Sequence, residues 1–201
     1  MSIEDVKSRF KKDLKDEIYD SRYIVQKYLC NGSSPILNDE EIFEIKFSIA
    51  NKFKIHPNEV IITGSGKLGF SIAPQKLFND FNENSDIDVA IISNNVFDEF
   101  WSDLLDFNIN IKNRNYIEEK NYRDFQDYFF RGWIRPDLFP FKYKRKTDWF
   151  NFFNDLTQKI YNYGEHKISA GIYKNFTTFE LYNIKNISSI RNKIKAGVSN
   201  E

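Results

Sequence analysis

Two short apolar segments constrain the fold of this chain more than any other feature. Residues 60–63 read VIIT, and residues 86–93 read DIDVAIIS. A short apolar run bounded by turn signals predicts a strand rather than a helix. Gly64 ends the first run abruptly, and the turn-like stretch NENSD leads into the second. The chain is therefore expected to form two strands, each with small or acidic residues at one end.

Helical periodicity fills most of the remaining sequence. Residues 39–53 carry apolar side chains on one helical face, behind Asn38 as the N-cap and Glu41 as its capping-box partner. Similar spacing predicts further helices, and one more apolar run predicts a third strand. The expected helices span 2–29, 39–53, 95–107 and 177–195, with more helix inside 113–163, and the third strand spans 166–176.

Together these elements predict an α+β fold built on a small mixed sheet. N-terminal, middle and C-terminal helices are expected to flank the sheet within a single domain of residues 1–201. In this prediction residues 1–55 form an N-terminal helical pair, and residues 113–163 form a helical insertion between strands. The sequence is 41% hydrophobic and 17% aromatic, which is enough to bury a core and excludes a disordered chain.

Charge and cysteine content limit the partners and the compartment. Lys plus Arg and Asp plus Glu both number 29, so no overall basic field attracts nucleic acid. Cys30 is the single cysteine, which excludes a disulfide framework and fits a reducing cytoplasm. The first residues are charged and helical, and no apolar run is long enough to span a bilayer. We therefore expect a cytoplasmic protein without a membrane partner.

The segment GSGK suggests a phosphate-binding P-loop, but the pattern is incomplete. A P-loop needs a Gly five positions before its Gly-Lys pair and a Ser or Thr directly after it. Ile61 and Leu68 occupy those two positions. The missing hydroxyl is the one that binds magnesium in a P-loop, so a metal ion would need ligands from elsewhere. Gly64 and Ser65 remain candidates for binding phosphate at this turn, with Lys67 either as an added cation or as a solvated lysine.

Asp86 and Asp88 are the candidate metal ligands. They open the second strand, and strand alternation puts both side chains on one face, about 7 Å apart along the backbone. Two carboxylates that share a face repel each other unless a cation lies between them. Mg²⁺ or Mn²⁺ takes hard oxygen ligands and shares them with substrate phosphates, as phosphoryl transfer requires. The alternative interpretation is a strand start with two solvated acids.

The order of these motifs resembles that of the DNA polymerase β-like nucleotidyltransferase superfamily. GSGKLGFS followed by SDIDVAIIS, each on its own strand, is similar to the bacterial members. Those members include minimal nucleotidyltransferases of toxin–antitoxin pairs and cyclic-oligonucleotide synthases of antiviral defence. The matching motifs cover about residues 60–93, and the resemblance implies that the small mixed sheet is that of the superfamily.

The resemblance also implies a function and a set of site residues. The function is metal-dependent transfer of a nucleoside monophosphate from a nucleoside triphosphate to a hydroxyl of a protein, an RNA or another nucleotide. Gly64 and Ser65 would bind the triphosphate, and Asp86 and Asp88 would be the catalytic, metal-binding carboxylates. The implied setting is phage defence or a toxin–antitoxin system.

The sequence departs from the superfamily at its third carboxylate, which normally lies on a neighbouring strand. The expected third strand, KISAGIYKN, contains no Asp or Glu. Asp137, Glu165 and Glu180 are the available substitutes, and none of them lies on that strand. Two predictions therefore stay open: an active nucleotidyltransferase, or a degenerate nucleotidyltransferase fold that binds a nucleotide or a partner without turnover.

A second candidate interface is the segment FKYKRK at 141–146. It interleaves aromatic side chains with four cations, a pattern that can bind a nucleic-acid backbone or stack a base. A solvated loop has the same composition, so contact with nucleic acid is one of two interpretations. Arg131 and Arg135, which flank Trp133, are likewise expected to pair either with phosphates or with nearby acids.

Overall fold

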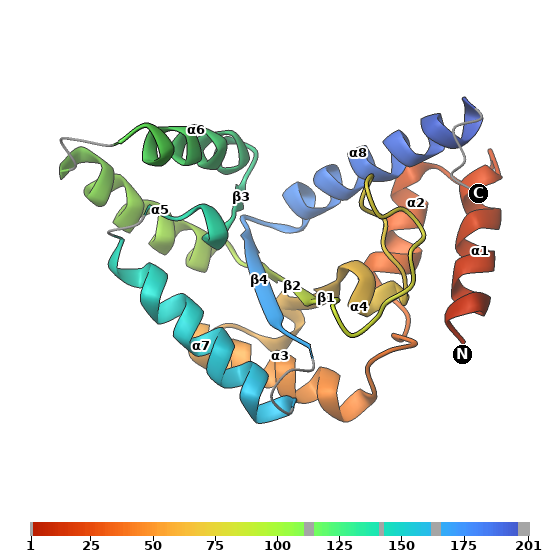
Figure 1. Ribbon diagram of the computed structural model, residues 1–201, viewed down its shortest axis with the longest axis horizontal. Coiled ribbons are helices and arrows are strands. Elements are labelled where there is room, and N and C mark those ends of the chain that lie inside the picture. The colour runs from red at the N-terminus through yellow and green to blue at the C-terminus, as the bar shows by residue number, and fades with distance from the viewer. Residues whose placement is uncertain (1, 111–114, 141–142, 162–165, 197–201) are drawn as a thin grey trace.

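A four-stranded mixed sheet organises the molecule, and its strands lie in the order β1-β2-β4-β3 (Figure 1). The computed structural model describes residues 2–110, 115–140, 143–161 and 166–196. β2 pairs antiparallel with β1 and parallel with β4, and β3 pairs antiparallel with β4. The predicted α+β fold with a small mixed sheet is therefore confirmed. The strands are β1 (Val60–Thr63), β2 (Ile87–Ile92), β3 (Trp133–Ile134) and β4 (Ile168–Tyr173).

Helices surround this sheet. In Figure 1, α3 and α7 lie together, α5 and α6 form an arm at one end, and α8 lies with α1 and α2 at the other. Short 3-10 and π-helical segments join several of these elements. The helices are α1 (Ile3–Lys15), α2 (Ser21–Val25), the π-helix η1 (Gln26–Cys30), α3 (Asp39–Phe53), η2 (Pro57–Glu59), α4 (Gly64–Leu68), α5 (Asn94–Asn110), α6 (Tyr116–Phe130), η3 (Pro136–Leu138), α7 (Lys144–Ile160) and α8 (Phe176–Lys195).

The N-terminal region corrects one prediction and confirms another. A single helix over 2–29 was wrong, because α1 ends before Asp16 and Asp20 starts α2 as a new N-cap. The carboxylate of Asp20 accepts a hydrogen bond from the Tyr23 amide, and short polar side chains that bond nearby amides favour caps and turns over continuous helix. In α3, Asn38 and Glu41 form the predicted capping box.

The middle region, residues 113–163, was predicted as a helical insertion and contains a strand as well as helices. α6 and α7 fall within it, but β3 lies between them and forms the edge of the sheet beside β4. Two residues are too few for an alternating pattern to be recognised, and Pro136 comes only two positions after Ile134. This strand brings the loop after α6 onto the same sheet as the two acidic candidates.

Strand alternation gives the sheet two different faces. On β2, Ile87, Val89 and Ile91 are buried in the larger core, which also contains apolar side chains from α3, α5 and α7. Asp88 and Ala90 alternate with them and face the other side, where Ala90 joins a smaller cluster with α8. Asp88 therefore lies on the sheet face that is turned toward α8.

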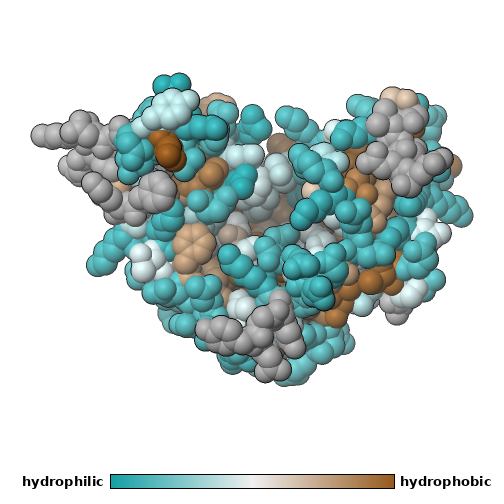
Figure 2. Space-filling model, viewed as in Figure 1, coloured by the Kyte–Doolittle hydropathy of each residue, from teal (hydrophilic) through white to brown (hydrophobic). Residues whose placement is uncertain are grey.

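A separate core fastens the N-terminal helices to α8. Phe10 of α1, Ile24 of α2 and Ile187 of α8 are fully buried in it. The surface seen in Figure 2 is mostly hydrophilic, and its outline dips between the α5–α6 arm and the α8 side. Among the described residues, every helix is too short or too polar to cross a bilayer.

Candidate functional site

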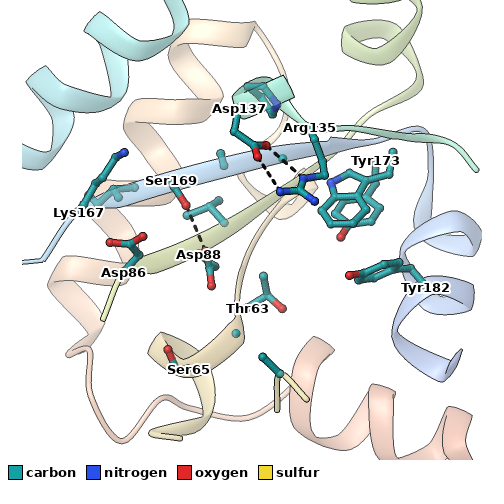
Figure 3. A pocket seen from close by; sticks show the side chains of 18 of the residues that line it. Thr63, Ser65, Asp86, Asp88, Arg135, Asp137, Lys167, Ser169, Tyr173 and Tyr182 are labelled. Carbon is teal, nitrogen blue, oxygen red and sulfur yellow. Dashed lines mark hydrogen bonds and ion pairs between the residues drawn. The ribbon is translucent and has the colours of Figure 1, made fainter. Parts of the chain in front are cut away.

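A pocket of about 620 Å³ opens on the sheet face that carries Asp88. This volume falls in the range of sites that bind small molecules. Its walls come from strands, turns and helices that are far apart in the sequence (Figure 3). The polar and charged residues in the lining include Thr63, Ser65, Asp86, Asp88, Arg135, Asp137, Lys167, Ser169, Tyr182, Asn183 and Asn186.

The Gly64-Ser65 turn is in contact with the Asp88 carboxylate. Thr63 of β1 is the register partner of Asp88 on β2, so the turn that follows Thr63 starts beside this carboxylate. Gly64 has φ +63, and a Cβ built there would lie 2.5 Å from Asp88 Oδ2. Only glycine combines this left-handed backbone with such a close approach. The Gly-Ser motif and the Asp-x-Asp motif therefore lie in one site, as the sequence predicts.

The Asp88 carboxylate is both desolvated and hydrogen-bonded. Water reaches it through the pocket, yet the surrounding protein desolvates it and raises its pKa to about 6. The nearby charge of Asp86 raises the pKa further, whereas a hydrogen bond from Ser169 opposes the shift. Ser169 Oγ donates that bond to Asp88 Oδ1 over 3.1 Å. The two acids therefore repel each other in the absence of a cation.

Asp86 and Lys167 complete this end of the pocket. Asp86 is exposed and lies just before β2, on the same side as Asp88. Lys167 lies just before β4; Figure 3 shows its side chain starting near Asp86 and its ammonium end turned away from the carboxylates, with Ser65 on their opposite side. The arrangement joins two acids with a hydroxyl and an ammonium group, which suits a phosphate ligand bound through a cation.

The residues present fit a divalent cation that phosphate oxygens help to hold. Mg²⁺ is commonly bound by one or two carboxylates, with substrate phosphates and water completing the shell. Asp86 and Asp88 supply those two carboxylates. Within the described part of the chain, no group of three or more His, Cys, Asp and Glu side chains is arranged to hold a metal ion.

None of the described substitutes for a third carboxylate is free to join the pair. Asp137 lines the pocket, but it forms a two-point ion pair with Arg135, whose Nη2 lies 2.6 Å from Oδ2. Glu180 points toward α2 and η1 instead, where it accepts hydrogen bonds from Arg22 of α2 and Gln26 of η1. Glu165 lies outside the described residues.

The position on β4 that faces Asp88 is taken by a hydroxyl. Asp88 and Ser169 are register partners on the parallel strands β2 and β4. An acidic side chain at this position would complete a set of three carboxylates, and Ser169 donates a hydrogen bond there instead. β4, whose residues 168–173 include no Asp or Glu, therefore brings a hydroxyl and no carboxylate to Asp88.

Two other cationic candidates make internal contacts. Lys67 lies outside the pocket lining, and its ammonium donates to the Gly32 carbonyl oxygen, while burial lowers its pKa. In the segment 141–146, Arg145 pairs with Glu99 and Asp103 of α5. Lys146 donates to a backbone carbonyl, Lys144 is exposed, and residues 141–142 lie outside the described ranges. We therefore leave both groups out of the proposed site.

Sequence reasoning missed several residues of the pocket. Lys167, Ser169 and Tyr182 were not singled out, and Arg135 was recognised only as a cation that could pair either way. Alternation along β4 gives the sequence one usable signal: it places Ser169, Gly171 and Tyr173 on the same strand face. Nothing in the sequence, however, indicates that this face adjoins Asp88.

No family model, curated protein or solved structure is significantly similar to this chain. The functional interpretation therefore depends on the geometry of the site and on the order of its motifs.

Proposed function

We propose that this chain is a metal-dependent nucleotidyltransferase with the fold of the DNA polymerase β-like superfamily. It would transfer a nucleoside monophosphate from a nucleoside triphosphate to an acceptor hydroxyl on a protein, an RNA or another nucleotide. The observation that supports this most is the contact between Asp88 and the Gly64 turn. That contact joins the Gly-Ser and Asp-x-Asp motifs in one pocket of suitable size.

The two acids and the polar residues around them have proposed roles. Asp86 and Asp88 would hold Mg²⁺ or Mn²⁺, which when bound neutralises phosphate charge and orients the reacting phosphorus. Ser65 and Lys167 lie on either side of the pair and would bind phosphate oxygens through a hydroxyl and an ammonium group. Ser169 fixes the orientation of the Asp88 carboxylate through its hydrogen bond.

Transfer of label from the α-phosphate tests the proposal. Each of the four α-labelled triphosphates is incubated with Mg²⁺ or Mn²⁺ and with RNA, a nucleotide or the protein itself as acceptor. We expect labelled product and pyrophosphate from the wild type and at least a hundredfold less from an Asp86→Asn, Asp88→Asn double variant. Asp98→Asn, an exposed acid of α5 outside the pocket lining, is the matched control. Equal turnover by all three proteins would refute the proposal.

The hydroxyl at Ser169 favours a second candidate, a protein that binds a nucleotide through this site without turnover. In that case the wild type binds a triphosphate with Mn²⁺ but transfers no label to any acceptor. Ser169→Asp then provides the acid that β4 lacks, and it is expected to bind Mn²⁺ several-fold more tightly. Label transfer that appears only in Ser169→Asp would establish the degenerate protein, whereas wild-type transfer would exclude it.

A further inference from the structure

A group of aromatic rings forms the wall of the pocket beside the carboxylates. The rings of Trp133 and Tyr173 are stacked, with centroids 5.3 Å apart and planes 7° apart. The ring of Tyr182, from α8, lies 4.5 Å from that of Trp133. Tyr173 is buried, whereas Tyr182 keeps part of its surface open to the pocket (Figure 3). Tyr182 is therefore an accessible ring held in place by two others.

This wall stands a short distance along β4 from the acids. Ser169, Gly171 and Tyr173 alternate on one strand face, and Ser169 contacts Asp88. The indole of Trp133 lies against Gly171, where a Cβ would come 2.6 Å from Nε1. Two residues of strand span about 7 Å, comparable to the ribose that separates the α-phosphate of a nucleotide from its base. A nucleotide with its phosphates at Asp88 would reach the rings with its base.

Amide side chains from α8 line the same wall. Asn183 is only 6% exposed, and its Nδ2 donates to the Phe179 carbonyl oxygen. This bond uses one of the two N–H groups of Nδ2. Within the ranges that the structure describes, the other N–H group and the amide oxygen Oδ1 of Asn183 make no hydrogen bond. Asn186 lies one turn further along α8 and also lines the pocket. An amide offers a donor beside an acceptor, the combination found on the edges of nucleobases.

Arg135 provides a fixed cation at the edge of the rings. Its Nε and Nη2 donate to Asp137, and its guanidinium lies over the rings of Tyr128 and Trp133 at 4.8 and 5.5 Å from their centroids. These contacts, with a further side-chain hydrogen bond to Tyr128, hold the guanidinium plane in one orientation at the edge of the pocket. A planar guanidinium oriented in this way is well suited to a phosphate oxygen.

We propose that Tyr182, Asn183, Asn186 and Arg135 form a nucleotide subsite next to the acids. Tyr182 stacks a nucleobase, the two amides bind the edge of the base, and Arg135 binds a phosphate. This inference rests on the proposed function, because the acids are taken to hold the triphosphate. The base belongs either to the donor triphosphate or to an acceptor nucleotide, and both have the same recognition chemistry.

Titration calorimetry with Mn²⁺ compares nucleoside triphosphates with inorganic tripolyphosphate, which has no base. In the wild type we expect the best nucleoside triphosphate to bind at least tenfold more tightly than tripolyphosphate, since stacking on an aromatic ring adds affinity. Tyr182→Ala should remove most of this difference and leave tripolyphosphate binding unchanged. Tyr182→Phe should retain the difference. Tyr116→Ala, an exposed ring of α6, is the matched control.

Arg135→Gln should weaken nucleotide binding while the protein remains folded, as judged by circular dichroism. A 5′-monophosphate titrated into protein saturated with a non-hydrolysable triphosphate distinguishes the two sources of the base. A second stoichiometric site that is lost in Tyr182→Ala assigns the base to an acceptor. Competition between the two ligands assigns it to the donor.

Separate results overturn the two proposals. Equal affinity of the wild type for tripolyphosphate and every nucleoside triphosphate, or no effect of Tyr182→Ala on either ligand, would overturn the subsite alone. Binding of tripolyphosphate and Mn²⁺ that is unaffected by Asp88→Asn would instead remove the proposed role of the acids. In that case a mononucleotide whose binding is lost in Tyr182→Ala would still support the subsite.

Discussion

At the scale of single residues, Gly64 has two roles that a residue with a side chain cannot fill. Its φ of +63 lets the chain turn out of β1, and its missing Cβ leaves room for the Asp88 carboxylate. Gly64→Ala should destabilise the protein by about 1–2 kcal/mol because the left-handed backbone disfavours alanine. It should also weaken Mn²⁺–triphosphate binding at least tenfold, because the new methyl group displaces Asp88. Chemical denaturation and calorimetry measure the two effects.

Gly32→Ala separates backbone strain from the contact with Asp88. Gly32 has φ +77, and the nearest atom to a Cβ built there, the Lys27 carbonyl oxygen, lies 3.8 Å away. Gly32→Ala should therefore lose similar stability and keep full ligand affinity. If both variants bound the ligand as tightly as the wild type, the contact between Gly64 and Asp88 would have no functional importance.

The Asp88 carboxylate makes stability depend on pH. Its folded-state pKa of about 6 lies above its ordinary value of 3.8, so ionisation costs folding free energy as the pH rises between these values. Asp88→Asn should thus be more stable than the ligand-free wild type at pH 7, by about 1–2 kcal/mol after allowance for water in the pocket. The difference should vanish near pH 4. Urea denaturation at both pH values checks this, and a less stable variant at pH 7 would contradict it.

At the scale of secondary-structure elements, one arginine ties the last helix to the first. Arg191 of α8 donates through Nη2 to the carbonyl oxygens of Asp13, Asp16 and Tyr19, which lie at the end of α1 and in the turn before α2. Carbonyl groups at a helix end lack partners within the helix, and a guanidinium group satisfies several at once. We expect Arg191→Met to lose about 2 kcal/mol of stability.

Ligand affinity should not change in Arg191→Met, because Arg191 lies outside the pocket lining. Denaturation midpoints measure the loss, and Arg22→Gln is the control because the Arg22 side chain is largely exposed and its ion pair is long, at 3.5 Å. A loss of less than 0.5 kcal/mol in Arg191→Met would show that the Arg191 hydrogen bonds contribute little to holding α1 and α8 together.

Elements with strong local signals could be predicted, and those determined by tertiary contacts could not. The α3 helix has a capping box and an apolar face, and the two acids have an apolar strand behind them, so each was found from the sequence. The break between α1 and α2 depends on short polar side chains inside an otherwise helical pattern. β3 has two residues and forms only because β4 lies beside it. Its position could not be predicted without knowing the order of the strands.

The same limit applies to the site. Gly64, Ser65, Asp86 and Asp88 could be grouped because they fall within one short part of the sequence. Arg135 follows β3, Lys167 precedes β4 and Tyr182 belongs to α8, and their approach depends on the crossover that places β4 between β2 and β3. Alternation could place Ser169 on a strand face, but only the register with β2 shows that it faces Asp88.

At the scale of the whole molecule, the pocket joins parts of the chain that otherwise have separate cores. Its lining runs from Thr63 to Asn186 and includes β1, β2, β3, β4 and α8. A ligand that bridges these elements stabilises the folded chain by mass action, by about 2.7 kcal/mol at a hundred times its Kd. For a chain of this size we expect a non-hydrolysable triphosphate with Mn²⁺ to raise the Tm by roughly 5–10 °C.

Asp88→Asn should lose this shift even though its ligand-free form is more stable. Arg191→Met should show the full shift from a lower starting Tm, because its site is intact. Differential scanning fluorimetry of the three proteins, with and without ligand, measures each value, and an equal shift in Asp88→Asn would mean that Asp88 takes no part in binding the ligand.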